Sequence, residues 1–178
     1  MSDVPRAPEG AFASFEAWII QRLLAETTRP TLRISRFLAM YFPHAAVRRK
    51  FWRATCVEIG EGSFLNPNCV VADDYMNGRV LLRVGKNCSI APGVVFAPIS
   101  NHNNSVELRS TGILDSMETD APIIIEDDVW IGANCTVAGG VTIGRCSVIG
   151  ANSFVNVDVP PYSLAAGTPA RVRRSLLP

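Results

Sequence analysis

An aliphatic side chain recurs at every sixth position between residues 125 and 155. The recurring residues are Ile125, Ile131, Val137, Ile143, Ile149 and Val155. Four residues after each of them stands a small or β-branched side chain: Val129, Cys135, Val141, Ser147, Ser153 and Val159. Neither the helical period of about 3.6 nor the strand period of about 2 produces a strict repeat of six. Such hexads are typical of a parallel β-helix, in which each hexad forms one short strand and one corner.

The same register appears twice upstream, at Ile59, Leu65 and Val71 and again at Val84, Ile90 and Phe96. Three hexads close one triangular coil, so the repeats predict about four coils with equivalent side chains stacked along the axis. The corner positions carry residues that tolerate unusual backbone angles: Asn134, Gly139, Gly140 and Asn152. Two insertions, 72–81 and 98–121, interrupt the register. Insertions in a solenoid project as loops, often on the binding face, so we expect the functional site there.

The composition argues against several classes of protein. With 178 residues and a hydrophobic content of 48%, the chain is one globular unit, and a net charge of +1 gives no reason to expect nucleic acid as a partner. No apolar stretch approaches the length of a membrane span, and the N-terminus lacks the pattern of a secretory signal, so we expect a cytoplasmic protein. Cys69, Cys88 and Cys135 fall on inward positions and are expected to be packed free thiols. Their spacing matches no metal site, and we expect no metal.

Residues 1–55 lie outside the repeat and are expected to be helical. One helix is predicted over 14–27, capped by Ser14, and a second over 31–42. The apolar face of the first would consist of Phe15, Trp18, Ile19 and Leu23. A basic stretch, 44–53, follows. The favoured interpretation is a helical cap over the open first coil, because solenoid ends need covering. The alternative is a surface for a phosphate-bearing acceptor or for anionic lipid, with peripheral membrane contact.

Four segments carry motifs of a known family. They are NPNCVVADD at 66–74, a loop histidine followed by ELR at 102–109, DVWIG at 128–132 and DVPPYSLAAGTPARVRR at 158–174. Through them the stretch from Val57 to Arg174 resembles the hexapeptide-repeat acyltransferases, especially the galactoside and maltose O-acetyltransferases and their relatives in surface-polysaccharide synthesis. The resemblance implies a left-handed parallel β-helix over residues 56–178, homotrimers with active sites between subunits, and acetyl-CoA as the acyl donor.

The resemblance also assigns roles to residues. His102 falls on the position of the general base, a role that suits histidine because its ring titrates near neutral pH. Glu107 is a candidate either to steady His102 or to be a simple surface carboxylate, and the other histidine, His44, is expected to be structural or solvated. Asn66 and Asp74 fall on positions that contact the acceptor. The positions that line the coenzyme A groove are Trp130, Ala133, Ala151, Asn156, Arg171 and Arg174.

We therefore expect an enzyme that transfers an acetyl group from acetyl-CoA to a hydroxyl or amine of a sugar or nucleotide-linked sugar, in surface-polysaccharide synthesis. The N-terminal third and the loop after His102, which is longer than the family's, depart from the resemblance and leave the acceptor open. An antibiotic acetyltransferase of the same superfamily is the alternative, and a non-catalytic β-helix scaffold is a third. A γ-type carbonic anhydrase shares the fold but needs three zinc-binding histidines, and the chain has two histidines.

Overall fold

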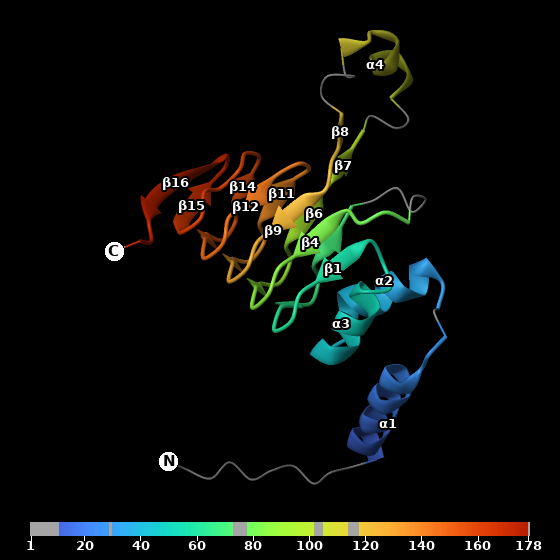
Figure 1. Cartoon of the computed structure of the whole chain (residues 1–178). Coiled ribbons are helices and arrows are strands. Elements are labelled where there is room, and N and C mark those ends of the chain that lie inside the picture. Colours follow the sequence, from blue (N-terminus) through green and yellow to red (C-terminus); the bar gives the residue numbers. More distant parts are fainter. Residues whose placement is uncertain (1–10, 29, 73–77, 102–104, 114–117, 178) are drawn as a thin grey trace.

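The structure is a computed structural model that describes residues 11–28, 30–72, 78–101, 105–113 and 118–177. Helices form the N-terminal part, and short strands stacked in three sheets form most of the rest (Figure 1). The helices are α1 (Ala11–Ala25), α2 (Leu32–Tyr41), α3 (Ala45–Trp52) and α4 (Val106–Ser110). None of the helices in the described part of the chain combines the length and the apolar character that crossing a bilayer requires.

Three sheets form the faces of a solenoid. Sheet A contains β1 (Val57–Ile59), β4 (Leu82–Val84), β9 (Ile123–Ile125) and β12 (Thr142–Ile143). Sheet B contains β2 (Phe64–Leu65), β5 (Ser89–Ile90), β10 (Trp130–Ile131), β13 (Val148–Ile149), β15 (Ser163–Gly167) and β16 (Ala170–Ser175). Sheet C contains β3 (Val70–Val71), β6 (Val95–Ala97), β11 (Thr136–Ala138) and β14 (Phe154–Val155). Neighbouring coils pair in parallel, apart from the antiparallel closing pair β15–β16, so the parallel solenoid that the hexads predict is confirmed.

The hexad residues form the core. Every residue of the predicted register, from Ile59 to Val155, is buried. Parallel pairing sets Ile131 between Ile90 and Ile149, so equivalent side chains stack in one column. Burying one such side chain stabilises the fold by about 1.5–3 kcal/mol. The second inward position also accepts polar groups when they are paired. The buried Ser147 hydroxyl donates to the Pro160 carbonyl at 2.9 Å and accepts from the Ser163 amide at 3.1 Å.

The cysteines are free, and the three inward ones are buried as predicted. The Cys88 thiol donates to the Glu126 carbonyl and the Cys135 thiol to the Gly150 carbonyl, each at 3.0 Å, so both bind the next coil. Burial raises the pKa of the Cys69 thiol to about 11, which keeps it protonated at neutral pH. Within the described residues, no three His, Cys, Asp or Glu side chains are grouped as metal ligands would be.

Two kinds of geometry explain the predicted corner residues. Positive φ angles occur, as predicted, at Asn134 (56°), Gly140 (78°) and Asn152 (57°). Gly139 has a different reason to be glycine. A Cβ there would lie 2.6 Å from the Pro98 carbonyl oxygen and 2.5 Å from Thr119 Cγ2, which belong to the two ends of the second insertion. The expectation of unusual backbone angles at Gly139 is therefore corrected to one of close approach.

The helical segment departs from the prediction at its start. α1 begins at Ala11, so Ser14 lies inside the helix, and the prediction that it is the N-cap is wrong. The second helix is confirmed. Its N-cap is Thr31, whose hydroxyl accepts from the Ile34 amide at 3.5 Å, and it ends at Tyr41. A proline two residues later, Pro43, is consistent with that stop because proline cannot donate the helical hydrogen bond.

The basic stretch 44–53 forms α3, and its cations bind backbone carbonyls. Arg48 is buried, and its guanidinium donates to the carbonyls of Phe42, Pro43 and Leu65. The Lys50 ammonium donates to the carbonyls of Leu23, Leu24 and Glu26, at the end of α1. These bonds join α1 and α2 to α3 and to the first coil. Arg48 and Lys50 are thus directed inward, and membrane contact through this stretch has no support.

Candidate functional site

The second insertion is an arm that projects from the solenoid (Figure 1). Strands β7 (Ile99–Ser100) and β8 (Thr119–Asp120) pair antiparallel in it, and α4 lies at its far end. The Ala121 amide donates to the Pro98 carbonyl at 3.0 Å and closes the base of the arm. His102 belongs to this arm but lies outside the described residues. Glu107 lies on α4 with an exposed side chain.

Both insertions leave the solenoid at the edge between sheets C and A, since the first lies between β3 and β4 and the second between β6 and β9. Arg79, near the end of the first insertion, forms an ion pair with Asp120 of β8. The two insertions are therefore adjacent in space. Asp74 belongs to the first insertion and lies outside the described residues. Sequence reasoning missed the Arg79–Asp120 pair because its partners are distant in the chain and belong to no motif.

The predicted site residues divide between two edges of the solenoid. Asn156 is exposed and follows β14 at the C–A edge, the same edge that carries both insertions. The other edge, between sheets B and C, carries Asn66, Ala133 and Ala151, which follow strands of sheet B. Sheet C separates the two groups. One copy of the chain therefore does not bring all the predicted site residues together.

Asn66 is held by the next coil. Its Nδ2 donates to the Ile90 carbonyl at 2.8 Å, and its backbone amide donates to the same oxygen at 3.1 Å. The side chain is half-buried. This geometry fixes the amide group at the B–C edge, so Asn66 has a structural role in addition to any contact with an acceptor.

The corners that carry Ala133 and Ala151 stack closely. A Cβ on Gly132 would lie 2.6 Å from the Ala151 amide nitrogen, so only glycine permits this approach. The Asn152 amide donates to the Ala133 carbonyl at 2.9 Å. The side chains of Ala133 and Ala151 are small, so they add little bulk over the backbone at the B–C edge.

The outer face of sheet B carries a continuous row of side chains in register. From the first coil to the last, the row runs Phe64, Ser89, Trp130, Val148, Leu164 and Arg174. Trp130 is 58% exposed and stands beside the corner of Ala133. Three strand spacings of about 4.8 Å separate Trp130 from Arg174, so the two backbones lie roughly 14 Å apart. An aromatic surface and a cationic end therefore share one face.

The predicted arginines belong to the terminal hairpin β15–β16. Arg171 and Arg174 are both exposed, and Arg171 donates to the adjacent Ala170 carbonyl at 2.7 Å. Arg173, between them, donates from Nε to the Ala166 carbonyl at 3.2 Å. Arg171 and Arg174 thus keep most of their donors available for a ligand at this end of sheet B.

Comparison with known proteins gives relatives for most of the chain. Residues 122–156 match the family described as bacterial transferase hexapeptide (six repeats). The galactoside O-acetyltransferase of Escherichia coli K12 is 40% identical over 120 residues, which are 67% of this chain and 54% of that protein. The chain thus spans about half the length of the curated relatives it matches.

Solved structures cover more of the fold. A hexapeptide-repeat acetyltransferase of Vibrio cholerae O1 biovar eltor, complexed with acetyl coenzyme A, is 30% identical, with a TM-score of 0.66 over 90% of each chain. A galactoside acetyltransferase in complex with coenzyme A is 29% identical, with a TM-score of 0.61 over 88% of this chain and 90% of that one.

Proposed function

Because the chain belongs to the hexapeptide-repeat acetyltransferases, we propose that it transfers an acetyl group from acetyl-CoA to a hydroxyl or amine of a sugar or nucleotide-linked sugar. Membership in the family also implies the left-handed winding of the β-helix. The observation that carries the proposal is the row on sheet B, in which the exposed Trp130 and the terminal arginines share one face. Surface-polysaccharide synthesis is the proposed setting.

The donor is proposed to lie along sheet B and the B–C edge. Trp130 offers a flat apolar wall to the pantetheine arm, and the small side chains of Ala133 and Ala151 leave backbone groups within reach of its amides. Arg171 and Arg174 are suited to the phosphates, because guanidinium–phosphate hydrogen bonds are charge-assisted. Asn156, at the C–A edge of a neighbouring copy, completes the proposed donor site.

The proposed chemistry is direct attack. The acceptor oxygen or nitrogen forms a bond to the acetyl carbonyl carbon, the carbon–sulfur bond of the thioester breaks, and the thiol of coenzyme A leaves. His102 takes the proton of the attacking group, since the chain's other histidine, His44, precedes α3 in the helical segment. Donors at the oxygen of the carbonyl would stabilise the negative charge that develops on it.

The acceptor is proposed to bind where the two insertions meet. Asp74 of the first insertion and Asn66 at the B–C edge of a neighbouring copy are the proposed contacts, and an amide with a carboxylate suits a polyhydroxylated ring better than a flat apolar drug. The Arg79–Asp120 pair supports this location, because it sets the end of the first insertion against the base of the arm. We assign the helical segment 1–55 the role of an end cap on the first of about four coils.

A homotrimer is proposed because the site residues lie on two edges. Apposing the B–C edge of one copy with the C–A edge of the next would complete each site, and cyclic symmetry would repeat the contact. The exposed side chains Trp130 on sheet B and Phe154 on sheet C offer apolar surface for it. We also place the reaction in the cytoplasm, where a chain whose cysteines are all free remains reduced.

The test is release of free thiol from acetyl-CoA in the presence of sugars, nucleotide sugars, amino sugars and chloramphenicol-like compounds. We expect sugar acceptors to be the better substrates. A preference for chloramphenicol-like compounds would replace the proposal with an antibiotic acetyltransferase, and no thiol release with any acceptor would leave a non-catalytic scaffold.

Mixing two variants tests the shared site. His102→Ala and Trp130→Ala proteins, unfolded together and refolded as mixed assemblies, would form some sites that contain both native residues. We expect the mixture to exceed the mean activity of the two separate variants. A monomeric mass by light scattering, or activity equal to that mean, would contradict a site built between subunits.

A further inference from the structure

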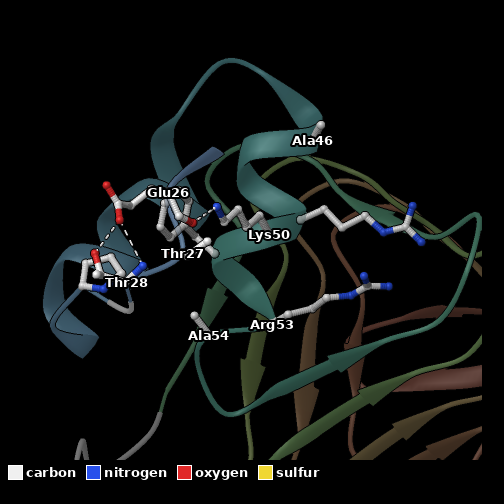
Figure 2. Close-up of a pocket in the computed structure, with 10 residues that line it drawn as sticks. Glu26, Thr27, Thr28, Ala46, Lys50, Arg53 and Ala54 are labelled. Carbon is white, nitrogen blue, oxygen red and sulfur yellow. Dashed lines mark hydrogen bonds between the residues drawn. The ribbon is translucent and has the colours of Figure 1, made fainter. Parts of the chain in front are cut away.

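A pocket of about 420 Å³ lies where the end of α1 and the linker after it meet α3 (Figure 2). Its lining includes Arg49 and Lys50 of α3, Arg53 at the C-cap of α3, and one carboxylate, Glu26. The acyl-transfer proposal uses none of these residues. A ligand in this pocket could bind only those charged groups that are not already engaged by the protein.

Lys50 and Glu26 are already engaged. The ammonium of Lys50 has three donors, and three carbonyls at the end of α1 accept from it. The Glu26 carboxylate accepts from the Thr28 hydroxyl at 2.6 Å and from the Thr28 amide at 3.0 Å. Figure 2 shows Glu26 and Thr28 together on one side of α3, whereas the side chain of Arg53 extends toward the other. The carboxylate is therefore bound to Thr28 and does not neutralise Arg53.

The two arginines are held beside each other by consecutive carbonyls. Arg49 donates to the Gly60 carbonyl at 2.9 Å, and Arg53 donates to the Ile59 carbonyl at 3.1 Å. Arg53, the C-cap of α3, follows Arg49 by one helical turn and lies on the same face. A guanidinium has five N–H donors, so each arginine keeps most of its donors. The backbone of the first coil thus orients two cations in advance.

Neither positive charge is paired. Among the described residues, ion pairs such as Arg22–Glu26, Arg79–Asp120 and Arg83–Glu58 occur, but Arg49 and Arg53 take part in none. Arg49 Nε is buried and has no hydrogen-bond partner among the described residues. Because protein atoms cover Nε, a ligand would be bound by the terminal nitrogens of the Arg49 guanidinium and not by Nε.

We propose that Arg49 and Arg53 form an anion site that binds the diphosphate group of a small molecule. Each guanidinium fork matches one phosphoryl group, so two forks side by side match a diphosphate. A membrane fits less well, because the cations line a concavity and two of the basic side chains of α3 are directed inward. The site lies at the first coil, apart from the Trp130 row, and does not depend on the acyl-transfer proposal.

The test is calorimetric titration of the full chain with inorganic pyrophosphate, with inorganic phosphate and a nucleoside diphosphate as further probes. We expect pyrophosphate to bind more tightly than phosphate. Arg53→Gln should weaken pyrophosphate binding by about tenfold or more. Arg33→Gln, which removes the same charge from an exposed position on α2, should leave it unchanged. Arg53 is the preferred variant because Arg49 is more deeply placed, and thermal unfolding of Arg53→Gln confirms that the fold is intact.

Several outcomes would overturn the site. These are equal binding to the native and Arg53→Gln chains, an equal loss in Arg33→Gln, and binding to phosphatidylserine vesicles without binding to pyrophosphate. The Michaelis constant for acetyl-CoA should not change in Arg53→Gln, and a parallel rise would show that the pocket belongs to the donor site. Failure of the chain to release thiol from acetyl-CoA would contradict the acetyltransferase proposal but would not affect the proposal of an anion site at Arg49 and Arg53.

Discussion

The coils and the helical segment of this protein are stabilised by different means. In the coils, the apolar residue at every sixth position is buried in a continuous column, and each coil repeats the contacts of the previous one. In the helical segment, Phe15 and Trp18 stack on each other with about 60% of their surface exposed, and α1 is bound through the carbonyls that Lys50 holds. The stability of the solenoid is therefore distributed over its coils, whereas α1 is attached by a few contacts, the polar ones at Lys50 and the apolar ones of the partly buried Ile20 and Leu23.

The largest effect on stability is expected inside the coils. Ile124 and Ile125 are neighbours on β9, but Ile125 is 1% exposed and Ile124 is 37% exposed on the outer face of sheet A. Ile125→Ala should lower the free energy of unfolding by about 2–5 kcal/mol, because it removes transfer energy and leaves a cavity. Ile124→Ala should lower it by less than about 1 kcal/mol. Denaturant titration measures both, and equal losses would refute a core built on this register.

The arm should show the opposite behaviour, a large effect on activity with little effect on stability. His102→Ala is expected to lower turnover by at least about 10²-fold, the range attributed to general base catalysis. The control is His44→Ala, which changes the chain's other histidine, an exposed residue that precedes α3. Thiol release and thermal unfolding are measured on both variants. Near-normal turnover of His102→Ala would contradict the assignment of His102 as the general base. Loss of folding in this variant would show that the histidine has a structural role.

The fold of the coils could be predicted because one rule applies at every position. The hexad register identifies which side chains point inward, and a shift of one residue would expose the whole column. The helical segment offers no such redundancy. α1 begins at Ala11 without using Ser14, and the role of Arg48 depends on carbonyls that only the folded chain brings together.

The candidate site could be predicted in part. Family motifs mark residues one by one, but they do not show that Asn66 and Ala133 lie on a different edge from Asn156. That separation follows from the order of the three sheets. Contacts between insertions are harder still, because the Arg79–Asp120 pair joins two loops whose lengths follow no repeat.

A smaller effect is expected at the terminal hairpin, where the row on sheet B ends. Changing both Arg171 and Arg174 to Gln should raise the Michaelis constant for acetyl-CoA by about tenfold, because exposed charge contacts fall at the low end of their range. The constant for the acceptor should change much less. Arg173→Gln is the matched control, since that side chain donates to Ala166 within the hairpin. Equal changes in both constants would assign the arginines a structural role.

The smallest effect on global stability is expected at Lys50, and it tests directly whether α1 is attached less stably than the coils. Lys50→Met keeps the length of the side chain but removes the three bonds to the carbonyls at the end of α1. Local attachments of this kind open at lower free energy than the core, so amide exchange in 11–25 should accelerate while global unfolding shifts by less than about 1 kcal/mol. Lys86→Met, at an exposed corner of the coils, should change neither. A global loss of several kcal/mol in Lys50→Met would show that α1 and the coils unfold as one unit, because the coils would then depend on the attachment of α1.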